Sequence, residues 1–169
     1  MSPTVEQTRP SLLWKSLSEE RRLQAATAFW EDEQSVAEQE EAVGAIARQI
    51  SFRPKSVLAQ PVDRRARQLA RMPRLSDALA GRLLVAYHLA TQRPMMGAFL
   101  DALGIGHEDG LISDEEVKAP AGDALVSAAR DLATRFPADD VRLYLSTLVM
   151  QDPDTWGPLS SVLEELATR

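Results

Sequence analysis

Few side chains of this chain have an ordinary pKa near neutral pH, because it contains only two histidines and no cysteine. His88 follows Tyr87 in the most apolar stretch of the sequence. A buried histidine beside a tyrosine can act as an acid–base pair, which makes a small-molecule pocket around Tyr87 and His88 one alternative function. Buried polar side chains more often satisfy a hydrogen-bond partner, so we expect His88 to be a core residue.

The second histidine, His107, lies in a region rich in Gly, Asp and Glu at residues 104–122. Around Gly110 this region resembles the calcium-binding loop of EF-hand proteins, with Glu116 as the ligand at the twelfth position. The first ligand position would be Ile105, whose side chain has no oxygen. Because calcium affinity depends on the number of ligand carboxylates, we predict an acidic surface loop instead.

Signatures of other catalytic sites are absent from the sequence. There is no His-Glu-x-x-His, no Gly-x-Ser-x-Gly and no phosphate-binding loop. Neither histidine follows a glutamate by three residues, as the di-iron sites of helical bundles require. We therefore expect no metal and no cofactor, and the absence of these signatures favours a non-enzymatic protein.

Basic residues gather in the middle of the chain, although its net charge is −6. Residues 48–93 hold ten basic side chains against two acids, a charge of +8, whereas residues 1–47 carry −5 and residues 94–169 carry −9. Because guanidinium groups pair with phosphate through two hydrogen bonds, part of this segment could bind an anion. The candidates within residues 53–74 are Arg53, Lys55, Arg64, Arg65, Arg67, Arg71 and Arg74.

The basic middle could instead fold against the acidic ends of the same chain, and we favour this arrangement. The net negative charge weakens non-specific attraction to nucleic acid. Within the basic segment Phe52 is the only aromatic residue before Tyr87, which leaves little for bases to stack on. Nucleic-acid binding is therefore an alternative that the sequence does not favour.

Prolines divide the chain into helix-sized segments, and no stretch alternates apolar and polar residues for long enough to predict a sheet. Whether the first two helices are one long helix is left open by residues 31–34. The expected helices cover residues 18–30, 35–50, 61–72, 76–92, 94–104, 124–136, 138–151 and 156–167, with a short turn of helix at 54–59. We predict an all-α, compact bundle of about seven or eight helices, with stacked helical hairpins as an alternative, forming a single domain over residues 1–169.

Residues 1–7 lack the basic start and apolar run of a secretory signal, and the longest nearly apolar run, residues 83–90, is too short for a bilayer. We therefore expect a cytoplasmic protein with no membrane contact. The leading hypothesis is a helical protein-interaction module that acts on a protein partner or self-associates. Tryptophan is enriched in binding hot spots, but we expect Trp14, Trp30 and Trp156 to pack between helices.

Overall fold

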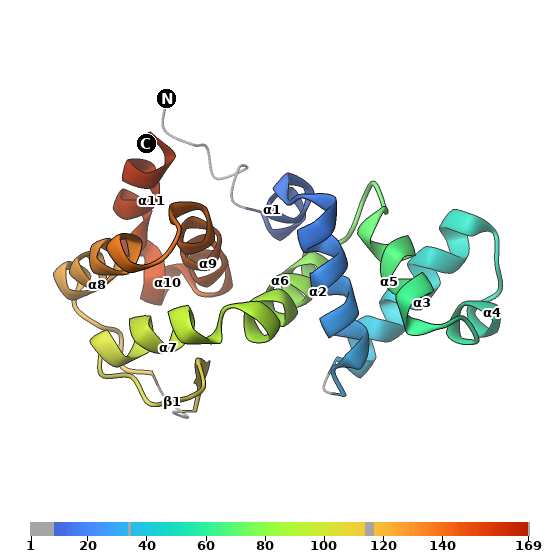
Figure 1. Cartoon of the computed structure of the whole chain (residues 1–169), viewed down its shortest axis with the longest axis horizontal. Coiled ribbons are helices and arrows are strands. Elements are labelled where there is room, and N and C mark those ends of the chain that lie inside the picture. The colour runs from blue at the N-terminus through green and yellow to red at the C-terminus, as the bar shows by residue number, and fades with distance from the viewer. Residues whose placement is uncertain (1–8, 34, 114–116, 169) are drawn as a thin grey trace. The chain divides into compact units, whose positions relative to one another are not determined.

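The computed structural model describes residues 9–33, 35–113 and 117–168, and helices make up most of them (Figure 1). The all-α prediction is therefore confirmed. Backbone contacts divide the chain into two compact units, Met1–Ala90 and Thr91–Arg169. The prediction of one domain over residues 1–169 stays a prediction. The expectations for residues 1–7 and for Glu116 lie outside the described residues.

The first unit is built from helices that largely match the predicted segments. Its elements are α1 (Pro10–Ser16), α2 (Glu19–Glu31), α3 (Val36–Ile50), α4 (Pro54–Leu58), α5 (Val62–Ala70) and α6 (Asp77–Thr91), which ends just past the unit boundary. Helix α2 packs along α5 and begins at Ser18, whose hydroxyl accepts the Arg21 N–H at 3.2 Å. Such a side chain satisfies one of the free N–H groups at a helix start. Helix α1 was not predicted, because seven residues are too few to show a period.

A polar network separates α2 from α3 and answers the question that residues 31–34 left open. The Gln39 side chain donates to the carbonyl oxygens of Phe29 and Asp32, each at 2.8 Å. Arg82 of α6 donates to the Ser35 hydroxyl at 2.7 Å and to the Asp32 carboxylate at 3.0 Å. The Ser35 N–H also donates to the Asp32 carbonyl at 3.3 Å, and α2 and α3 are two separate helices.

One predicted inner-face residue of α3 is exposed. The helical spacing of Val36, Val43 and Ala47 in the sequence predicts one inner face, but Val36 is 57% exposed, whereas the other two are buried. The seven-residue spacing puts Val36 and Val43 on the same side of the helix. Val36 lies in the first turn, however, and the buried residues of α3 begin only at Ala42. Periodicity predicts the direction of a face but not how much of it a neighbour covers.

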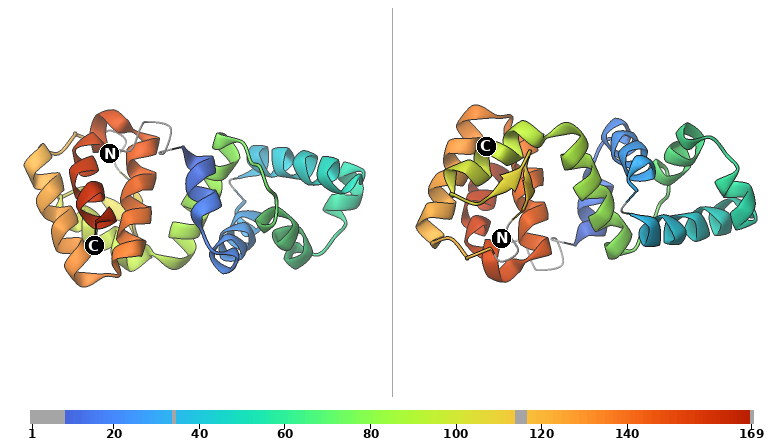
Figure 2. Two further views of the ribbon diagram at one scale, coloured as in Figure 1. Left: turned by 90° about the horizontal axis from the view of Figure 1, so that it is seen from above. Right: turned by 90° about the horizontal axis from the view of Figure 1, so that it is seen from below.

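The second unit is a helical cluster that carries a small hairpin. Helices α8, α9 and α11 lie side by side (Figures 1 and 2). The ring of Phe99 meets that of Tyr144 edge-on, with centroids 5.8 Å apart. The elements are α7 (Arg93–Ala102), β1 (His107–Glu108), β2 (Leu111–Ile112), α8 (Gly122–Arg135), α9 (Ala138–Gln151), α10 (Pro153–Trp156), the 3₁₀ helix η2 (Gly157–Leu159) and α11 (Ser160–Ala167).

The hairpin lies inside the region predicted as a loop. Strands β1 and β2 are antiparallel, with His107 opposite Ile112 and Glu108 opposite Leu111. Asp109 and Gly110 both adopt positive φ angles, 48° and 88°, as the two central residues of the tightest hairpin turns do. Two-residue strands are too short to show alternation, so the sequence pattern could not predict them.

Candidate functional surface

Helix α4 presents basic and apolar side chains on one exposed surface of the first unit. Val57 is fully buried and faces α3. Successive helical residues are about 100° apart, so Lys55 and Leu58 point away from the side that Val57 buries. Leu58 is 56% exposed, a high value for a large apolar side chain.

The end of α3 leaves Phe52 exposed just before α4 begins. Ser51 adopts the left-handed conformation (φ 56°), and the Phe52 N–H donates to the Ala47 carbonyl at 2.9 Å. This is a common way to end a helix, and the residue after the left-handed one usually packs back on the helix. Phe52 is nevertheless 49% exposed, although this hydrogen bond holds its backbone. We call Phe52, Arg53, Lys55 and Leu58 the α4 surface.

The predicted anion-binding cations differ in the contacts that their side chains make. Arg67 pairs with Asp63 at 3.3 Å, and Arg71 pairs with Glu19 of α2 at 3.0 Å. The guanidinium of Arg65 lies 4.8 Å from the ring centre of the buried Trp30, in a cation–π contact. Of the predicted anion-binding cations, four are exposed and form no ion pair with the described residues: Arg53, Lys55, Arg64 and Arg74.

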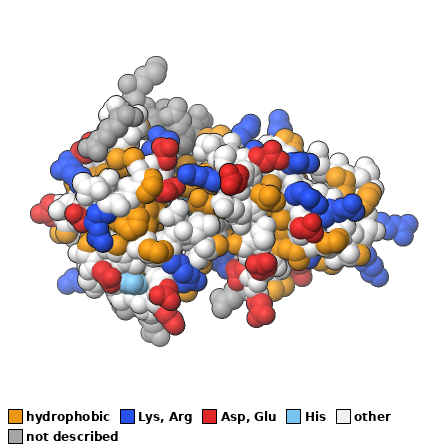
Figure 3. Space-filling view, in the orientation of Figure 1, with side chains coloured by type: hydrophobic (Ala, Val, Ile, Leu, Met, Phe, Trp, Pro, Cys, Tyr) orange, Lys and Arg blue, Asp and Glu red, His pale blue; other side chains and the backbone are white. Residues whose placement is uncertain are grey.

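Acidic residues of the N-terminal segment therefore neutralise only part of the basic middle. Glu19 engages Arg71, and Asp32 engages Arg82, but neither reaches the cations of α4. Figure 3 shows Lys and Arg side chains beside hydrophobic ones over the part of the first unit that holds α3, α4 and α5. A basic surface with an apolar component remains open there.

The second predicted site, around Tyr87 and His88, is buried. Tyr87 and His88 are only 3% and 2% exposed, and their rings meet edge-on at 5.4 Å. The His88 Nδ1 lies 2.8 Å from the Leu84 carbonyl oxygen, so Nδ1 carries the proton that it donates. Burial lowers the pKa of His88 to about 4, which keeps the imidazole neutral at pH 7. A ligand pocket at this pair stays a prediction.

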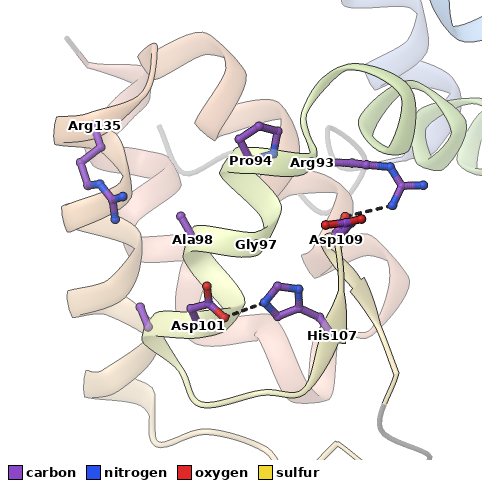
Figure 4. Close-up of a pocket in the computed structure, with 9 residues that line it drawn as sticks. Arg93, Pro94, Gly97, Ala98, Asp101, His107, Asp109 and Arg135 are labelled. Atoms are coloured by element: carbon purple, nitrogen blue, oxygen red, sulfur yellow. Dashed lines mark hydrogen bonds and ion pairs between the residues drawn. The ribbon is translucent and has the colours of Figure 1, made fainter.

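A shallow pocket of about 660 Å³ lies on the second unit, across the exposed side of α7 (Figure 4). His107 stands at one side of it, with Nε2 2.7 Å from the Asp101 carboxylate. The Gly110 N–H donates to Nδ1 at 3.0 Å, so Nε2 carries the ring proton of the neutral imidazole. Both ring nitrogens are engaged, and the imidazole therefore holds the hairpin instead of serving as a free base.

The pocket has charged side chains but no metal-binding geometry. Arg135 stands on its α8 side, and Arg93 donates to the Asp109 carbonyl at 3.0 Å (Figure 4). Within the described residues, no three His, Cys, Asp or Glu side chains come close enough together to hold a metal ion. The described helices also include none with the length and apolar character needed to cross a bilayer.

Sequence reasoning missed the apolar half of the α4 surface. The basic residues were visible as a run of charge, but Phe52 and Leu58 look like ordinary core residues. The one available signal was the adjacent pair Val57 and Leu58 in a short helix, since only one of two neighbours can face inward. The three tryptophans are all buried, as expected.

No protein-family model, curated protein or solved structure matches this chain. Its function must therefore be argued from its own surface.

Proposed function

We propose that this protein is a non-enzymatic helical interaction module that binds an acidic, amphipathic segment of a partner protein through the α4 surface. The observation that carries the proposal is the exposure of Phe52 and Leu58 beside Arg53 and Lys55. No acidic side chain of the described residues pairs with these two cations. We further propose that the protein acts in the cytoplasm without a cofactor.

The two kinds of side chain have separate roles in this proposal. Covering Phe52 and Leu58 removes apolar area from water, and each Å² removed stabilises the complex by about 25 cal/mol. Arg53 and Lys55 supply long-range attraction, which raises the association rate and selects partners of negative charge. An amphipathic helix with leucine on one side and glutamate beside it satisfies both requirements. The surface is small, so the expected complex is weak and short-lived.

Two other partners carry negative charge, and the surface fits them less well. DNA and RNA attract cations without needing apolar contacts, and the net charge of −6 opposes their approach. An anionic membrane is bound more strongly by long helices with a continuous apolar face, and α4 has only five residues. We therefore favour a protein segment.

A direct test uses a synthetic amphipathic peptide of leucine and glutamate, labelled for fluorescence anisotropy. The full chain should bind it, and Lys55→Glu/Leu58→Ser should weaken binding by at least about tenfold. The matched control is Asp63→Ala/Arg67→Ala, which removes a neutral ion pair on the neighbouring helix α5 and should bind normally.

Labelled duplex DNA and anionic phospholipid vesicles are measured in the same buffer. Binding of either one, without binding of the peptide, would overturn the proposal in favour of a nucleic-acid or membrane partner. Equal peptide binding by the wild type and Lys55→Glu/Leu58→Ser would show that the α4 surface is not the site.

A further inference from the structure

The β-hairpin of the second unit carries the chemical counterpart of the α4 surface. Glu108 and Asp109 are exposed acids, and Leu111 is 51% exposed. Glu108 and Leu111 are direct partners across the two strands, so their side chains stand next to each other on one face. Among the described residues of the second unit, Leu111 is the only large apolar side chain so exposed.

This hairpin is held in one conformation although its strands are short. The Gly110 N–H bonds to His107, whose other ring nitrogen bonds to Asp101 of α7. Arg93 donates to the Asp109 carbonyl at 3.0 Å and fixes the turn from the other side (Figure 4). A surface ordered before binding loses little conformational entropy when a partner covers it.

The two units also carry net charges of opposite sign, which favours contact between the first unit of one copy and the second unit of another. Residues 1–90 hold thirteen basic and eleven acidic side chains, a charge of +2, whereas residues 91–169 hold six and fourteen, a charge of −8. The first unit of one copy therefore attracts the second unit of another more than it attracts another first unit.

We propose, resting on the function proposed above, that the partner of the α4 surface is the β-hairpin of a second copy of this chain. Arg53 and Lys55 of one copy meet Glu108 and Asp109 of the next, and Leu111 packs against Phe52 and Leu58. The interface joins two different surfaces, so it continues from copy to copy and forms open chains or closed rings.

Sedimentation velocity at low salt, over a range of protein concentrations, tests this assembly with two single-surface variants. Arg53→Glu/Lys55→Glu reverses the charge of the α4 surface, and Glu108→Gln/Asp109→Asn neutralises the hairpin surface while keeping a residue that tolerates positive φ at position 109. Because only one of the two surfaces is reversed in sign, the two altered surfaces do not attract each other in a mixture. The wild type should form species larger than dimers as its concentration rises. Each variant alone should remain monomeric, and an equimolar mixture of the two should form dimers and nothing larger.

The mixture distinguishes contact between copies from any other use of the two surfaces, because each variant keeps one functional surface. The milder variants Leu58→Ser and Glu108→Gln, checked for native helix content by circular dichroism, should weaken assembly in the same direction. Asp63→Ala/Arg67→Ala should assemble like the wild type.

A wild type that stays monomeric while still binding the leucine–glutamate peptide would overturn this inference and leave the proposed function standing. Loss of both activities would overturn both. Oligomers that persist in both variants, or a mixture that forms no dimer, would show that other surfaces join the copies.

Discussion

The backbone N–H of Gly110 donates a 3.0 Å hydrogen bond to Nδ1 of His107, and this bond fixes the form of the imidazole. With Nδ1 as acceptor, the proton of the neutral ring lies on Nε2, which faces Asp101 at 2.7 Å. The histidine thereby connects the hairpin turn to α7. A histidine in the region predicted to be an acidic surface loop is therefore a structural link that holds the hairpin with Glu108 and Leu111.

Gly110 is predicted to be the least replaceable residue of the hairpin. A Cβ at this position would lie 2.7 Å from the Cβ of Met96, and its φ of 88° disfavours any L side chain. We expect Gly110→Ala to lower the free energy of unfolding by roughly 2–4 kcal/mol, measured by urea denaturation.

The control for this change is Gly104→Ala. Gly104 also has positive φ, 69°, but a Cβ there would meet nothing within 4 Å. Gly104→Ala should lower the free energy of unfolding only by the strain that a positive φ imposes on an L side chain, roughly 1 kcal/mol. Equal losses for the two variants would contradict the close packing of Gly110 on Met96.

The buried His88 predicts a specific pH dependence of stability. Burial lowers its pKa from the ordinary 6.5 to about 4 in the folded state, so the unfolded chain binds more protons between these values. Stability is therefore fully present above about pH 6.5 and falls as the pH decreases toward 4, by up to about 3 kcal/mol. Chemical denaturation across this range measures the slope, and His88→Leu should flatten it.

Two carboxylates act at lower pH and do not confuse this measurement. Hydrogen bonds from Ser11 lower the pKa of Asp77, and those from Thr155 lower the pKa of Asp152. Their contributions are lost only as the pH falls below the ordinary aspartate value of 3.8. An unchanged slope in His88→Leu between pH 4 and 6.5 would show that His88 is not the responsible group.

Substitutions of exposed and buried apolar residues in and next to α4 should affect peptide binding and stability differently. Phe52→Ser and Leu58→Ser alter half-exposed side chains, so each should change the free energy of unfolding by no more than about 0.5 kcal/mol. Each should nevertheless weaken binding of the leucine–glutamate peptide. Val57→Ala removes a fully buried side chain and should cost about 2 kcal/mol. A large stability loss in Leu58→Ser would mean that this side chain is covered in solution.

Salt should weaken peptide binding through Arg53 and Lys55. At 0.1 M salt, the attraction between exposed charges more than about 10 Å apart is largely screened. We expect the affinity of the wild type to fall with added salt, and Arg53→Ala/Lys55→Ala to bind weakly with a smaller salt dependence. Asp63→Ala/Arg67→Ala should keep the wild-type slope, because it removes a pair of opposite charges. A slope unaffected by the loss of Arg53 and Lys55 would assign the attraction to other cations.

Much of the helical architecture could be predicted because its signals are local. Ser18 caps α2 at the start of the helix predicted over 18–30, and Ser76 accepts the Leu79 N–H at the start of the helix predicted over 76–92. The most apolar stretch of the sequence predicted a core position for His88, and both Tyr87 and His88 of α6 are buried. Proline and a capping hydroxyl act over one helical turn, so the sequence shows them directly.

The candidate site could be predicted only in part, because exposure depends on long-range packing. The charge run identified Arg53 and Lys55, but it did not separate them from Arg71, which pairs with Glu19 from 52 residues away. The exposure of Leu58 follows from the choice of Val57 as the buried residue of α4. The Asp109-Gly110 pair is a turn signal that is visible in the sequence. The hairpin also depends on contacts of His107 with α7, which no local pattern shows.

The most direct test of the central claim is a titration of the ¹⁵N-labelled chain with the leucine–glutamate peptide, followed by amide chemical shifts. The α4 surface predicts that the shifts move in a saturable way at residues 51–58, and that the amides of the buried His88 helix stay unchanged. Shift changes confined to α7 and its pocket, or none at saturating peptide, would contradict the claim that the α4 surface is the binding site.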